Sequence, residues 1–71
     1  MDWRNFDRIM REAEWLNSKK RLPYEFMKTL KKNKCWRNNE PFCSWDYFTY
    51  SMSNKQIEEI QNSFLKMKEK A

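Results

Sequence analysis

The 71-residue chain contains no glycine, although average usage of about 7% would place about five in a chain of this length. Glycine is the usual residue in primed hairpin turns, in phosphate-binding loops and at helix ends, because it tolerates positive φ angles. Its absence disfavours β-hairpins and excludes the glycine-rich nucleotide-binding motifs. Chain reversals must instead use asparagine and serine, at Asn17-Ser18, Asn33, Asn38-Asn39 and Ser53-Asn54.

The length of the chain indicates one small domain, which we expect to span residues 1–71. A chain this short buries only about 60% of its unfolded surface, so its core is thin. The four Trp, three Tyr and five Phe residues can still build a core, because each buried aromatic side chain removes about 150–250 Å² from water. We predict an all-α fold, namely a small three- or four-helix bundle.

The clearest periodic segment is the helix expected over residues 2–17. Its apolar face consists of Trp3, Phe6, Ile9, Met10, Ala13 and Leu16. The opposite side carries Arg4, Arg8, Arg11 and Trp15. Tryptophan and arginine are enriched at binding hot spots, so this stripe is a candidate contact surface. The alternative is that Trp15 packs against the rest of the fold and the arginines simply lie over it.

Three further helices are expected, over residues 23–33, 44–51 and 53–70. Pro23 suits a first helical turn, because its missing N–H group would be unpaired there in any case. Ser53 followed by Gln56 fits a capping box. The 23–33 helix repeats the pattern of aromatic and basic residues on one face, at Tyr24, Lys28 and Lys31.

The segment between these helices is less regular. Residues 44–52 alternate like a strand, but no second strand candidate exists and Ser44 fits a helix N-cap, so we favour a helix. We interpret residues 34–43 as a loop that Trp36 and Phe42 pin to the core.

The net charge of +5 is concentrated in the middle of the chain. Residues 17–39 contain eight Lys or Arg and a single acidic residue, whereas the remainder contains seven basic and nine acidic residues. This local excess is typical of a surface that binds nucleic acid or an acidic partner, and the alternative is a solvated exterior that only aids solubility. The candidate partner-binding residues are Arg4, Arg8, Arg11, Trp15, Lys19, Lys20, Arg21, Tyr24, Lys28, Lys31, Lys32, Trp36 and Arg37.

The chain offers little for catalysis or metal binding. Histidine is absent, which removes the commonest general base and the commonest metal ligand. The two cysteines, Cys35 and Cys43, cannot complete a structural zinc site, which needs four ligands. Lys34, Trp36 and Arg37 could lower the pKa of Cys35, but no nucleophile and base have a recognisable spacing. We expect no enzymatic activity, no cofactor and no metal.

The sequence also indicates the cellular compartment of the protein. It has no run of about 20 apolar residues for a membrane span, and its start lacks the apolar run of a secretory signal. We therefore expect a cytoplasmic protein that does not enter the membrane and whose cysteines are free thiols. The alternative for the two cysteines is a disulfide.

We expect a small non-enzymatic protein that regulates or inhibits a larger, nucleic-acid-processing protein with an acidic surface. Scattered acidic residues argue against a dedicated nucleic-acid binder, and the Lys- and Asn-rich composition is typical of phage-encoded host-takeover or anti-defence proteins. The alternative is direct binding of DNA or RNA, with Trp15, Tyr24 or Trp36 stacked on bases. A helix-turn-helix that presents Asn54 to Gln56, and a homodimer, are further alternatives.

Overall fold

The structure is a computed structural model, and it describes residues 3–69 of the chain. The elements, in chain order, are α1 (Trp3–Ser18), α2 (Tyr24–Lys32), β1 (Trp36–Arg37), β2 (Glu40–Pro41), α3 (Trp45–Tyr50) and α4 (Asn54–Glu69). The prediction of a small helical bundle is confirmed, and the predicted helix bounds that fall within the described residues differ from these by one residue. The predicted start at Asp2 and end at Lys70 lie outside the described residues. No helix within residues 3–69 is long and apolar enough to cross a membrane.

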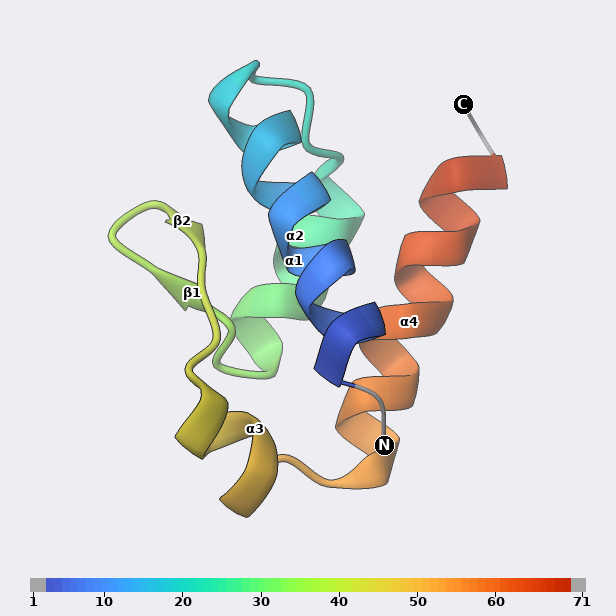
Figure 1. Cartoon of the computed structure of the whole chain (residues 1–71). Coiled ribbons are helices and arrows are strands. Elements are labelled where there is room, and N and C mark those ends of the chain that lie inside the picture. The colour runs from blue at the N-terminus through green and yellow to red at the C-terminus, as the bar shows by residue number, and fades with distance from the viewer. Residues whose placement is uncertain (1–2, 70–71) are drawn as a thin grey trace.

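The frame of the bundle consists of α1, α2 and α4 (Figure 1). α4 packs along both α2 and α1, and the core lies among the three helices. Its most deeply buried side chains are Phe6 from α1, Phe26 and Leu30 from α2, and Ile60 from α4. These residues belong to the apolar faces that the helical periodicity predicts. The helices therefore form because each has one face to bury against the other two.

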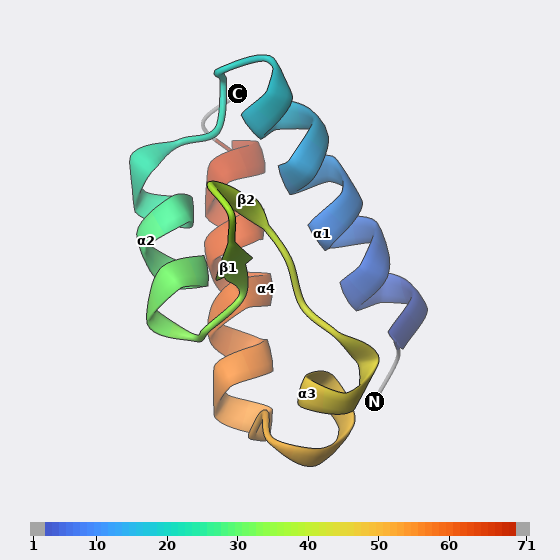
Figure 2. The same ribbon diagram turned by 90° about the vertical axis from the view of Figure 1, so that its left-hand side faces the viewer.

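A hairpin formed by β1 and β2 lies on one side of the bundle, between α1 and α2 (Figure 2). Only Asn38 and Asn39 separate the two strands, and both have positive φ angles, of 53° and 62°. Such angles are those of a primed turn, which asparagine tolerates. The chain therefore forms a hairpin although the absence of glycine disfavours one, and the predicted loop at 34–43 contains two short strands. The amide of Asn17 donates to the Asn39 carbonyl at 2.9 Å and ties the turn to α1.

The alternation of side chains along the hairpin decides which of them reach the core. Trp36 and Pro41 face each other across the two strands; Pro41 is buried and Trp36 is half-buried against the core. Phe42, one residue further, is 40% exposed. The prediction that Phe42 pins this segment is therefore wrong. The segment is held instead by Trp36, Pro41 and the fully buried Cys35.

A serine directly precedes each of the last two helices and caps it, as predicted. The Ser44 hydroxyl accepts a hydrogen bond from the Tyr47 backbone N–H at 3.1 Å, so residues 44–52 form a helix rather than a strand. At the start of α4, the Gln56 N–H donates to Ser53 Oγ at 3.3 Å, and the Ser53 N–H donates to Gln56 Oε1 at 2.9 Å. These reciprocal bonds are the predicted capping box.

Aromatic rings dock α3 on the beginning of α1. The Phe48 ring centroid lies 4.9 Å from those of both Phe6 and Trp3. Trp45 meets Trp3 edge-on at 4.8 Å, although Trp45 itself is 53% exposed. A six-residue helix is too short to be stable alone, so these contacts hold it in place.

Candidate partner-binding surface

The structure exposes twelve of the thirteen candidate partner-binding residues and leaves Trp36 half-buried. It does not bring all of them together. One group lies on α1, and another lies on α2 and the hairpin. Because the hairpin lies between α1 and α2, the two groups form separate surfaces (Figure 2).

The group on α1, here called the α1 stripe, consists of Arg4, Arg8, Arg11 and Trp15. It lies opposite the face that carries the buried residues of α1. Within the helix, Arg11 Nε pairs with Asp7 Oδ2 at 2.9 Å, and Arg8 Nη2 donates to Asn5 Oδ1 at 2.8 Å. Trp15 is 54% exposed, so it is not a core residue covered by the arginines.

The second group, here called the α2–hairpin surface, combines exposed basic side chains with aromatic rings. It consists of Tyr24, Lys28 and Lys31 of α2 with Trp36 on one face of the hairpin, and of Arg37 and Phe42 on the other face of the hairpin. The ammonium of Lys28 lies 5.8 Å from the centre of the Tyr24 ring, and that ring is 64% exposed. The ammonium of Lys31 lies 5.4 Å from the centre of the Trp36 ring. Both distances are within the range in which a cation is attracted to an aromatic face.

Phe42 belongs to this surface although the sequence predicts it as a core anchor. The guanidinium carbon of Arg37 lies 5.0 Å from the Phe42 ring centre. The strand register pairs Arg37 with Glu40, and Phe42 follows Glu40 by two residues, so all three lie on the same face of the hairpin. The signal that could have found it is this two-residue alternation, which is visible only once Asn38-Asn39 is read as a turn.

The remaining basic candidates have different surroundings. Lys19 Nζ lies 6.0 Å from the Trp15 ring, at the end of the α1 stripe. Lys20 adopts a positive φ angle of 57° in the connector to α2. Lys32 turns toward α4, where its ammonium pairs with Glu59 Oε1 at 3.2 Å. Lys32 therefore forms an ion pair between two helices, although its side chain remains 71% exposed.

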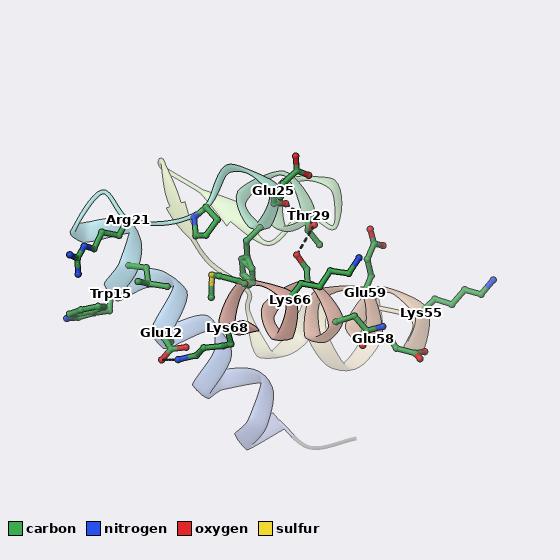
Figure 3. Close-up of a pocket in the computed structure, with 16 residues that line it drawn as sticks. Glu12, Trp15, Arg21, Glu25, Thr29, Lys55, Glu58, Glu59, Lys66 and Lys68 are labelled. Carbon is green, nitrogen blue, oxygen red and sulfur yellow. Dashed lines mark hydrogen bonds and ion pairs between the residues drawn. The ribbon is translucent and has the colours of Figure 1, made fainter. Parts of the chain in front are cut away.

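A groove lies between α1, α2 and α4 (Figure 3). Leu16, Phe26 and Met67 supply apolar lining, and an ion pair of 2.8 Å joins Lys68 on α4 to Glu12 on α1. Its volume of about 1390 Å³ exceeds the roughly 300–1,000 Å³ of a small-molecule pocket, and its other charged residues have both signs. The groove is therefore not matched to one small charged ligand. The candidate residues that line it are Trp15 and Arg21.

The two cysteines are free thiols, as predicted. A hydrogen bond with Cys43, together with burial, raises the pKa of the Cys35 thiol, and the same hydrogen bond lowers the pKa of the Cys43 thiol. The pKa of Cys35 is therefore raised, and not lowered as its neighbours Lys34, Trp36 and Arg37 could have done. Cys35 is completely buried, and the group that controls its ionisation is the other thiol.

Within residues 3–69, no cluster of three or more His, Cys, Asp or Glu side chains is placed to hold a metal ion. Comparison of the chain with protein-family models, with curated proteins and with solved structures gives no match. The surfaces described above are therefore the features from which a function can be inferred.

Proposed function

We propose that this chain is a non-enzymatic binding protein that regulates a larger protein by docking the α2–hairpin surface on an acidic face of it. The observation that carries the proposal is the position of the net charge. Residues 19–37, which include α2 and β1, contain eight Lys or Arg and one acidic residue. In contrast, α1 and α4 each contain three basic and three acidic residues.

This distribution gives the α2–hairpin surface a property that the α1 stripe lacks. On α1 each arginine charge is offset by an acidic residue of the same helix, as in the pair of Arg11 with Asp7. On α2 only Glu25 offsets the lysines. A concentrated patch of one sign speeds the encounter with a partner of opposite charge and orients it.

The aromatic residues of the surface favour a protein partner over a nucleic acid. To stack on a base, a ring must offer a free face. Trp36 packs against the core and also carries the Lys31 ammonium over its ring, so it is poorly placed for stacking. Tyr24 is exposed beside Lys28, an arrangement that suits the centre of a protein interface, where aromatic side chains anchor the contact.

The two free thiols support a reducing compartment such as the cytoplasm, because disulfides persist mainly in oxidising surroundings.

The test is capture of partners from a lysate of the source cell by the tagged full-length chain, with and without nuclease, followed by mass spectrometry. We expect one stoichiometric protein that survives nuclease treatment. The double variant Lys28→Gln/Lys31→Gln should weaken its binding about tenfold, because two charges are removed from the interface. The matched control is Lys55→Gln/Lys66→Gln, which removes the same charge from exposed positions of α4.

Three outcomes would contradict the proposal. Equal loss of binding in both double variants would mean that overall charge matters and the surface does not. Capture that disappears with nuclease would indicate direct binding of DNA or RNA. The dependence of oligonucleotide affinity on salt concentration would then give the number of phosphate contacts. If no stoichiometric partner is captured, the basic residues of the α2–hairpin surface serve only as a solvated exterior.

A further inference from the structure

Three sulfur atoms meet where the hairpin joins the rest of the fold. Cys35 directly precedes β1, Cys43 follows β2 by two residues, and Met52 lies between α3 and α4. The Met52 Sδ atom lies 3.9 Å from Cys35 Sγ and 3.8 Å from Cys43 Sγ. The Met52 sulfur therefore contacts both thiols, which also influence each other's ionisation.

Two of the three side chains are buried, and the third is partly accessible to solvent. Cys35 is completely buried and Met52 is 9% exposed, whereas Cys43 is only partly buried. The two thiols donate hydrogen bonds to backbone carbonyls, Cys35 to that of Asn33 and Cys43 to that of Ser44, each at 3.6 Å. An ion could therefore enter past Cys43 and find a site made of sulfur.

We propose that Cys35 Sγ, Cys43 Sγ and Met52 Sδ form a binding site for a soft monovalent metal ion, Cu(I). Two thiolates and one thioether are the donors that Cu(I) prefers. Closed structural zinc sites use four ligands drawn from cysteine, histidine and carboxylates, and a thioether is not among them. Calcium and magnesium require oxygen ligands. The donor set thus selects one class of metal.

The distances from Met52 to the two thiols fit this ion. A metal held at the length of a zinc–thiolate bond, about 2.3 Å, from each of three sulfurs in a trigonal plane would place the sulfurs about 4.0 Å apart. The two Met52 distances of 3.8 and 3.9 Å match two sides of that triangle. On binding, each thiol releases its proton to water and forms one Cu–S bond, and Met52 donates a lone pair. Copper stays Cu(I), so no electron is transferred.

The test is a titration of the reduced full-length chain with Cu(I), without oxygen, against a coloured Cu(I) chelator as competitor. We expect one Cu(I) per chain. Met52→Leu keeps the shape and volume of the side chain and removes only the donor, so it should stay folded and bind Cu(I) about tenfold or more weakly. The matched control is Met67→Leu, a half-buried methionine of α4 that should leave the affinity unchanged.

A second variant, Cys43→Ser, should abolish the binding, and circular dichroism of each variant checks that it is folded. If Met52→Leu binds Cu(I) as tightly as the unmodified chain, the site is an ordinary dithiol and the proposal fails. If the unmodified chain leaves all Cu(I) with the competitor, the three sulfurs serve packing alone and the proposal fails as well. If Cys43→Ser does not fold, the Met52→Leu comparison still decides.

Discussion

Two lysines occupy positions where helices usually end with glycine. Lys34 follows Asn33, the C-cap of α2, and has a φ angle of 60°. The Cys35 N–H donates to the Leu30 carbonyl at 2.8 Å, and the Lys34 N–H donates to the Lys31 carbonyl at 3.1 Å. Lys20 has a φ angle of 57° after α1 and takes part in the equivalent pair of bonds. Both ends are Schellman motifs, so the chain forms glycine-type helix ends without glycine.

The strain at these lysines leads to a prediction about stability. A left-handed backbone conformation costs a non-glycine residue about 1–2 kcal/mol, and replacement by glycine removes this cost. Glycine also has more conformational freedom in the unfolded chain, which costs about 0.5–1 kcal/mol on folding and offsets part of the gain. Lys34→Gly and Lys20→Gly should therefore each raise the free energy of unfolding by about 0.5–1 kcal/mol, measured by urea titration. The control Lys28→Gly, in the middle of α2, should lower it by about 1 kcal/mol. Destabilisation by Lys34→Gly would contradict this account of the helix end.

At the scale of elements, the four helices depend on different forces. α1 and α4 are each 16 residues long and have a continuous apolar face, so their own sequence favours helix. α3 has six residues and persists because Phe48 packs on Phe6 and Trp3. The hairpin has two residues in each strand and depends on its packing against α1. The short elements are therefore held by the long ones.

The capping box gives a prediction at this scale. Ser53→Ala removes the acceptor of the Gln56 N–H and should lower the free energy of unfolding by about 1 kcal/mol in a urea titration. Gln56→Ala should also destabilise the chain, and the double variant should lose less than the sum, because the two bonds support each other. Ser51→Ala, at the exposed end of α3, is the control and should change stability little. Strict additivity of the two cap variants would mean that they do not act as one box.

For the molecule as a whole, the exposed apolar residues are dispersed. They lie on five different parts of the fold, namely Trp15 on α1, Tyr24 on α2, Phe42 beyond β2, Trp45 and Tyr50 at the two ends of α3, and Leu65 on α4. A stable interface between two copies requires a contiguous apolar patch, and dispersed residues do not supply one. The positive charge of residues 19–37 would also repel a second copy that docked by the same surface.

We therefore predict that the chain is a monomer of 9.0 kDa in solution. Light scattering should give this mass at physiological salt over the whole micromolar concentration range. High salt screens the repulsion between basic surfaces, so a measurement in 1 M salt is the sharper control. A doubled mass at physiological salt would point to a homodimer and would require Trp15 or Tyr24 to be tested as its anchor.

Much of the fold can be predicted from local sequence signals. The apolar period of α1 and the capping box of α4 involve residues no more than four positions apart, so no distant contact is needed to recognise them. The turn at Asn38-Asn39 is also recognisable as a reversal, but its strands are too short to show a pattern of their own. That is why Phe42 is wrongly assigned to the core.

The sequence by itself determined where the helices lie and that residues 19–37 carry an excess of positive charge. It also determined that no turn uses glycine. These features depend only on composition and short-range spacing. Only the tertiary structure decided how they combine. The hairpin docks between α1 and α2, and this separates the α1 stripe from the α2–hairpin surface. Its closure also brings Cys35, Cys43 and Met52 into contact across 17 sequence positions. Such contacts follow from the packing of whole elements, which short-range spacing does not specify.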